Sequence, residues 1–96
     1  PSMMHNIYGS MAMARHRVEE YEDAIKYYEL SYRHNPKNIS ALSSIGYCYE
    51  RMKRYDKALE YYERYLKVGK KGSQGYNFVE ESIAYIKQEK FMELTE

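Results

Sequence analysis

A nine-residue segment occurs twice in this chain, and its recurrence constrains the fold more than any other feature. Residues Tyr21–Glu29 and Tyr55–Glu63 lie thirty-four positions apart and share five of nine residues: a tyrosine, an alanine, two further tyrosines and a glutamate. A fixed period of this length indicates stacked supersecondary units, each burying its apolar face against the next. Such stacks generally present binding surfaces, so the repeat argues against an enzyme.

Length and composition fit a single domain with no pronounced charge. Ninety-six residues suit one small domain. A net charge of +1 gives no field that would by itself attract nucleic acid or membrane lipid. No apolar run approaches the ~18 residues needed to cross a bilayer, and no signal peptide is visible. Cys48 is the only cysteine, which rules out an internal disulfide and favours a reducing compartment, so a cytoplasmic location is expected.

Tyrosine is unusually frequent, with thirteen copies against two phenylalanines and no tryptophan. The tyrosine ring can fill core volume while its hydroxyl group stays in contact with solvent, which suits a thin stack of helices. The alternative is that these rings stack on nucleic-acid bases. The structural interpretation is favoured, and no nucleic-acid partner is expected.

Helical periodicity and breaking residues predict five helices and no strand. Pro36 interrupts the chain after the second helix, because proline disfavours helical geometry in the preceding residue. Asn38 and Ser73 are the expected N-caps of the third and fifth helices. The expected helices span residues 5–18, 21–34, 39–52, 55–68 and 74–90. Their exposed faces are expected to carry the i,i+4 pairs Glu22–Lys26, Glu29–Arg33, Glu60–Arg64 and Glu63–Lys67.

Small residues interrupt otherwise bulky helix faces at matching places in the two repeats. Ala12 and Ala24 stand in the first repeat where Gly46 and Ala58 stand in the second. Small residues at these positions would let two antiparallel helices approach closely, with large side chains filling the space on either side. The predicted fold is therefore all-α and built from helical hairpins.

This pattern resembles the tetratricopeptide repeat over about residues 5–90. The first copy departs from it at Arg15, where an aromatic residue is usual, and the second has Lys70 in place of the closing proline. Tyr65 replaces a residue that is normally small, so the junction with the fifth helix is expected to be looser or rotated. The second copy carries the pattern at Leu42, Ile45, Gly46, Tyr49, Tyr55, Ala58 and Tyr62, and the first at Tyr8, Met11, Ala12, Tyr21, Ala24, Tyr28 and Pro36.

The resemblance implies one domain, 1–96, folded as a right-handed superhelical stack of antiparallel helix pairs. Repeat one would span about 5–38, repeat two about 39–72, and a single capping helix about 73–92. The first helix of each pair would line a concave groove. Groove positions carried over from the family are Asn6, Met13, His16, Arg17, Ser43, Ser44, Tyr47, Glu50, Arg51, Asn77 and Glu81.

These groove positions suggest how a peptide would be held. Met13 and Tyr47 would form an adaptable apolar floor, and Arg17 with Arg51 could grip a carboxylate. Serines and asparagines could bond a peptide backbone. For each residue, the alternative is a merely solvated face. One family subclass grips the C-terminal carboxylate of heat-shock chaperones with lysine and asparagine, and that set is absent here.

No catalytic, metal or cofactor site is expected. The three histidines fall on different helix faces without the i,i+4 pairing that would hold zinc. His16 beside Glu50 could mimic a base and its orienting carboxylate, but no nucleophile or oxyanion donor accompanies them. Cys48 is expected to be a buried, unreactive thiol.

Two functions remain open. In the first, the chain is a protein-interaction module that binds a peptide or partner helix in its groove, as part of a larger scaffold or regulatory protein. In the second, it is a self-association segment that forms a homo-oligomer through apolar side chains at its two ends. Those end residues are Met3, Met4, Ile7, Phe91, Met92 and Leu94.

Overall fold

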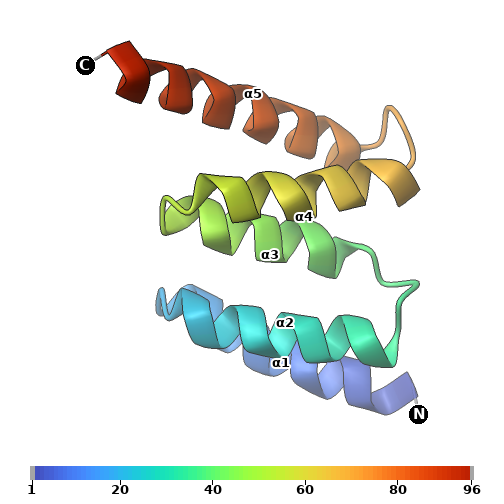
Figure 1. The fold of residues 1–96 in the computed structure, drawn as a ribbon. Helices are drawn as coiled ribbons and strands as arrows, with labels where there is room; N and C mark the ends of the chain where they lie inside the picture. The colour runs from blue at the N-terminus through green and yellow to red at the C-terminus, as the bar shows by residue number, and fades with distance from the viewer. Residues whose placement is uncertain (1, 96) are drawn as a thin grey trace.

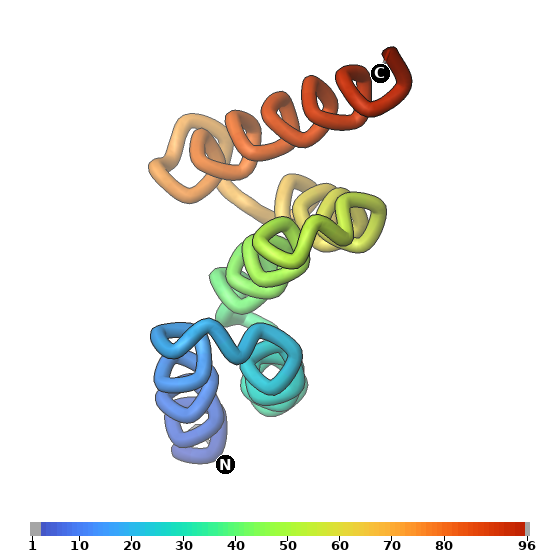
Figure 2. The backbone as a smooth tube through the Cα atoms, turned by 90° about the vertical axis from the view of Figure 1, so that its left-hand side faces the viewer, coloured from blue at the N-terminus to red at the C-terminus, as the bar shows by residue number. Residues whose placement is uncertain are grey.

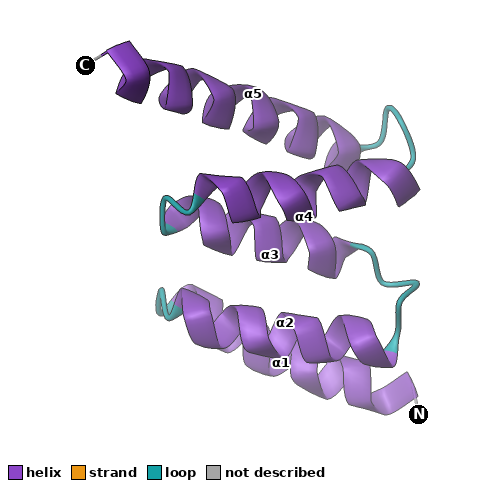
Figure 3. Cartoon of the chain, in the orientation of Figure 1, coloured by secondary structure: helices purple, strands orange, loops and turns teal. Residues whose placement is uncertain are grey.

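The computed structural model describes residues 2–95 as five helices stacked in chain order (Figure 1). The described range consists of helices and the loops and turns between them and contains no strand (Figure 3). The predicted all-α class and the five helices are confirmed. The helices are α1 (Ser2–Arg17), α2 (Tyr21–His34), α3 (Ser40–Arg51), α4 (Tyr55–Val68) and α5 (Gln74–Thr95).

Each of the two hairpins turns in the same way. Glu19 lies between α1 and α2 with φ 61°, and Lys53 lies at the equivalent place between α3 and α4 with φ 60°. Both residues adopt the left-handed region, which costs a non-glycine residue energy but reverses the chain within very few residues. The repeat is therefore present in the backbone geometry of the turns as well as in the sequence.

One of the two predicted helix caps forms. The Ser73 hydroxyl accepts a hydrogen bond from the Tyr76 N–H at 3.3 Å, as an N-cap should. The side chain of Asn38 instead accepts a hydrogen bond from the Ser40 hydroxyl at 2.7 Å. Ile39 takes the N-cap position of α3 without any side-chain cap, so the prediction for Asn38 is wrong.

Small residues hold the two helices of each hairpin close together, as predicted. Ala12, Ala24 and Ala58 have no exposed surface. A Cβ added to Gly46 would lie 2.7 Å from the ring of Tyr62, which is itself fully buried. Because real Cβ atoms do not approach so closely, glycine at this position is what allows the ring to pack against α3.

The apolar core continues from one hairpin to the next. One cluster joins α1, α2 and α3 and contains Cys48, and a second joins α3, α4 and α5 around Leu42 and Tyr62. Burial raises the pKa of the Cys48 thiol to about 12, so the thiol is protonated at neutral pH and poorly nucleophilic. The prediction of a buried thiol is confirmed.

The junction between α4 and α5 differs from the junctions inside the hairpins. Tyr65 is buried there, and a Cβ on Gly75 would overlap its hydroxyl. In Figure 2, α5 is seen along most of its length and runs obliquely to the helices of the two hairpins, which are foreshortened. Tyr65 thus occupies a position that is usually small, and Gly75 of α5 leaves room for its ring. The last helix is rotated relative to the hairpins, as expected for this junction.

Surface charges pair between elements more than along one helix. None of the four predicted i,i+4 ion pairs is formed within residues 2–95. Arg54 instead reaches Glu22 of the other hairpin at 3.0 Å, and Lys90 of α5 reaches Asp56 of α4 at 2.6 Å. These pairs are exposed and contribute little stability, but they leave several basic side chains without an acidic partner.

The described helices also bear on membrane insertion. Within residues 2–95, none is both long enough and apolar enough to span a bilayer.

Candidate binding face

An uncharged hollow of ≈ 360 Å³ lies on the side of the molecule formed by α1, α3 and α5. Three ring side chains and two serines surround it, so it is apolar with a few hydroxyl groups. These residues are His16 from α1, Ser43, Ser44 and Tyr47 from α3, and Phe78 from α5. Three successive elements of the stack thus contribute to one site.

The rings at this hollow form a continuous row across the face. His16 stacks on Tyr47 with ring centroids 5.4 Å apart, and Tyr47 lies 6.2 Å from Phe78. At the other end of the row, the edge of His16 meets Tyr21 at 5.7 Å. Aromatic side chains bury a large area with few rotatable bonds, which makes such a row a rigid surface for an apolar ligand group.

Two buried tyrosines support the row from beneath with equivalent hydrogen bonds. Nδ1 of His16 and the Tyr28 hydroxyl are 3.1 Å apart and hydrogen-bonded, and the Tyr62 hydroxyl donates to Oε1 of Glu50 at 2.8 Å. Burial lowers the pKa of His16, so the imidazole is neutral at pH 7. Burial, with the Glu50 carboxylate adding to it, raises the pKa of Tyr62 well above its ordinary value.

A smaller hollow of ≈ 200 Å³ continues the first towards the beginning of α1. Ser44 lies between the two hollows, and Gly9, Met13 and Ser31 contribute to the second. The Ser31 hydroxyl donates to the His5 carbonyl at 2.8 Å, which holds α2 against α1 at this point. The residues that line these two hollows include no aspartate, glutamate, lysine or arginine.

Comparison with known proteins identifies the architecture. The family model described as tetratricopeptide repeat matches residues 3–71, well over half of the chain. The chain belongs to the tetratricopeptide repeat family. No curated protein and no solved structure matches the chain. Tetratricopeptide repeats generally mediate protein–protein interaction and are typically not enzymes.

The matched region of this tetratricopeptide repeat chain ends before α5, although α5 supplies Phe78 to the larger hollow. The assignment of α5 as a capping helix and the exact repeat boundaries stay predictions. One physical feature favours the capping role. Glu80 stands on α5 where Ala12 and Gly46 stand in the repeats, and a residue of that size would keep a following helix from approaching closely.

The predicted groove residues of the repeat fall into two groups. One group lines the two hollows: Met13, His16, Ser43, Ser44 and Tyr47. The other group lies outside them: Asn6, Arg17, Glu50, Arg51, Asn77 and Glu81. The hollows thus contain only uncharged members of the predicted set, whereas its charged members do not line them.

Three charged members of the second group have particular surroundings. Nε of Arg51 lies 3.4 Å from the Tyr21 hydroxyl, so Arg51 is directed towards α2. Arg17 is exposed at the end of α1 and makes no side-chain hydrogen bond within residues 2–95. Glu50 bonds to Tyr62 while His16 bonds to Tyr28, which gives each member of the suspected base–carboxylate pair a different partner.

Sequence reasoning missed Phe78, whose ring closes the larger hollow. The repeat period held the necessary signal, because Phe78 lies thirty-four residues after the predicted groove residue Ser44. The groove positions carried over from the family pattern were instead Asn77 and Glu81 on this helix, and both side chains are exposed.

Residues 2–95 contain no group of three histidine, cysteine, aspartate or glutamate side chains arranged to hold a metal ion.

Proposed function

We propose that the face formed by α1, α3 and α5 binds an extended segment of a partner protein, with an apolar side chain of that segment seated among His16, Tyr47 and Phe78. The observation that carries this proposal is the row of neighbouring rings around an uncharged hollow. Apolar anchors in such hollows typically dominate the free energy of binding.

The neighbouring hollow supplies the polar part of this recognition. Ser44 and Ser40 present hydroxyl groups beside the exposed thioether of Met13. Hydroxyls can bond the backbone of an extended peptide, and methionine adapts its shape to different side chains. Because no charged side chain lines either hollow, binding at this face should depend little on salt concentration.

A peptide library selected on the purified chain would test the proposal. We expect the selected peptides to share an aromatic or large aliphatic residue and to bind Tyr47→Ala/Phe78→Ala at least about tenfold more weakly, as for the loss of a hot-spot residue. Tyr85→Ala removes an exposed ring elsewhere on α5 and serves as the matched control. If the selected peptides bind the double variant as tightly as the unmodified chain, this face is not the binding site.

Self-association is the second candidate, and the exposed apolar ends of the stack favour it. Met3 is 71% exposed at the beginning of α1, and Leu94 is 86% exposed near the end of α5, next to exposed Phe91 and Met92. Exposed apolar clusters of this kind often mark interfaces. Analytical ultracentrifugation over a wide concentration range should show an oligomer that Phe91→Ser/Leu94→Ser dissociates. A monomer at every concentration would eliminate this candidate.

A further inference from the structure

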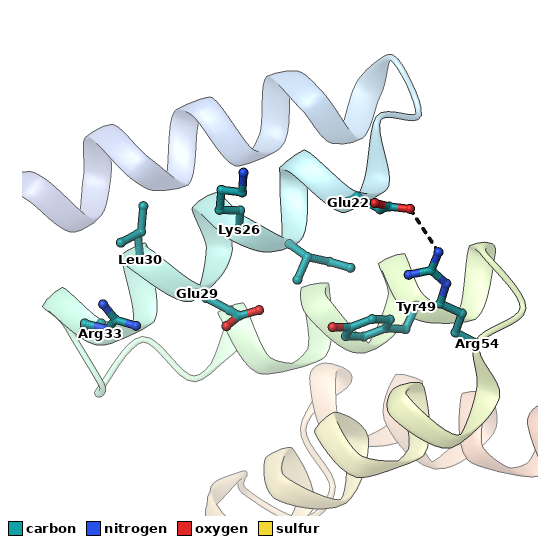
Figure 4. A pocket seen from close by; sticks show the side chains of 8 residues that line it. Glu22, Lys26, Glu29, Leu30, Arg33, Tyr49 and Arg54 are labelled. Carbon is teal, nitrogen blue, oxygen red and sulfur yellow. Dashed lines mark hydrogen bonds and ion pairs between the residues drawn. The ribbon is translucent and has the colours of Figure 1, made fainter.

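A second recess lies on the other side of the stack, where α2 faces α3 and α4. It consists of two adjoining hollows of ≈ 580 and ≈ 350 Å³ that share Glu29 and Arg33. Figure 4 shows the larger hollow, with Arg33 at one end of α2, the Glu22–Arg54 pair at the other, and Tyr49 across from them. Since the 14 residues of α2 extend for about 20 Å, this inter-hairpin cleft is long enough for a short peptide segment.

The floor of the inter-hairpin cleft is apolar. Ile25 of α2 and Ile45 of α3 line it from the core, where both are almost fully buried. Tyr49 stacks on Tyr61 with ring centroids 5.8 Å apart and continues this floor towards α4. A ligand in the cleft would therefore meet carbon at the bottom and charged groups only at the rim.

The rim of the cleft carries an excess of positive charge. Glu22 is neutralised by Arg54 at 3.0 Å. The remaining rim charges are the Glu29 carboxylate and three cations, Lys26, Arg33 and Arg64. None of these four groups takes part in an ion pair within residues 2–95, so the cleft holds uncompensated cations above an apolar floor.

Arg64 lies over tyrosine rings and has no acidic partner among residues 2–95. Its guanidinium carbon lies 4.8 Å from the ring centroid of Tyr61 and 5.8 Å from that of Tyr32. Its expected helical partner Glu60 instead lies 3.9 Å from Lys57. A guanidinium held over an aromatic ring and without an acidic partner can bind a carboxylate, in the best case in a bidentate manner.

We infer that the inter-hairpin cleft is a second docking surface, which binds an acidic segment of a partner protein. Carboxylates of the segment pair with Arg64 and Arg33, and an apolar side chain beside them lies on the Tyr49–Tyr61 floor. The charge of the rim argues for this occupant, since an apolar segment would leave three cations unpaired and a basic one would be repelled. The surface is separate from the uncharged face of α1, α3 and α5, so the two can be occupied together.

The test uses a probe peptide of alternating glutamate and leucine and a matched peptide with glutamine in place of glutamate. Binding to the isotopically labelled chain is followed by NMR at low salt. We expect the glutamate peptide to shift the amides of Arg33, Tyr61 and Arg64, and to lose affinity as salt is added. Arg33→Gln/Arg64→Gln should bind it about tenfold more weakly.

Two control variants make the result specific. Lys71→Gln/Lys87→Gln removes the same net charge from exposed positions outside the cleft and should change the affinity less than about twofold. Tyr47→Ala/Phe78→Ala disables the other face and should leave the affinity unchanged. The inference is overturned if both charge-removing variants weaken binding equally, if the glutamine peptide binds as well as the glutamate peptide, or if the Tyr47→Ala/Phe78→Ala variant loses the probe.

Discussion

The two hairpins have similar sequences, yet the buried tyrosine of each hairpin forms a hydrogen bond with a chemically different group. Tyr28 and Tyr62 are thirty-four residues apart, and so are their partners His16 and Glu50. The first partner is an imidazole kept neutral by burial, and the second is a carboxylate. The repeat thus preserves the position of a contact while its chemistry varies: at this position the first hairpin has a neutral imidazole and the second has a carboxylate.

A second difference between the hairpins comes from their place in the stack. Ala14 and Cys48 are equivalent in the repeat, but Ala14 is exposed whereas Cys48 is fully buried. Cys48 packs into the cluster that joins the first hairpin to α3, and no described element covers the corresponding side of α1. The same sequence position is therefore core in one hairpin and surface in the other.

The largest expected effect comes from enlarging a small residue inside a hairpin. Ala58→Leu would force α3 and α4 apart at a fully buried position, and we expect it to lower the free energy of unfolding by about 3 kcal/mol, the upper end for overpacking. For a domain of this size that corresponds to a fall in Tm of at least about 10 °C. Ala84→Leu, at an exposed position of α5, is the control; equal melting of both variants would refute the close approach.

The two tyrosine hydrogen bonds should differ in strength. Tyr62→Phe leaves the half-buried carboxylate of Glu50 without its donor and should cost about 1.5–3 kcal/mol, as for hydrogen bonds to charged groups. Tyr28→Phe removes a bond to a neutral imidazole and should cost only about 0.5–1.5 kcal/mol. Urea unfolding of both variants measures the difference, and the reverse order would show that the charge of the partner does not decide it.

Alkaline pH should reveal the buried thiol that distinguishes the second hairpin. The Cys48 pKa is about 12 in the folded chain but near 8.5 when unfolded, so above pH 8.5 the unfolded state binds fewer protons. Stability is therefore retained below that pH and falls as the pH rises, by about 1–2 kcal/mol at pH 10 from this group. Cys48→Ala should show a smaller fall over the same range by urea unfolding, and parallel curves would exclude the thiol as the cause.

The smallest effect is expected at the junction between α4 and α5, which lies outside the two repeated hairpin contacts. Gly75→Ala places a methyl group against the Tyr65 hydroxyl and should destabilise the chain by about 1 kcal/mol. In a Tyr65→Phe background, which lacks that hydroxyl, the same change should be neutral or stabilising, because alanine favours helix over glycine. Thermal melts of the four variants form a double-mutant cycle; additive effects would mean that the two groups do not meet.

Much of the fold could be predicted because its determinants are local or periodic. Pro36 and the cap at Ser73 act within a few residues of themselves. The thirty-four-residue period identified the small residues Gly46 and Ala58 at the hairpin contacts. The candidate sites were less predictable, because Phe78 lies beside Tyr47 and Tyr62 of other helices and Arg64 lies between Tyr61 of its own helix and Tyr32 of α2.

By itself, the sequence determined the helices and the hairpin pairing, since propensity, turn chemistry and apolar spacing operate over one or two helical turns. Only the tertiary structure decided which polar groups meet. Arg64 lies over tyrosine rings and does not pair with Glu60, and Glu22 of the first hairpin forms an ion pair with Arg54 of the second. These choices depend on how the helices cross and on which side chains a neighbouring helix brings within a few ångströms, and neither quantity is encoded in local spacing.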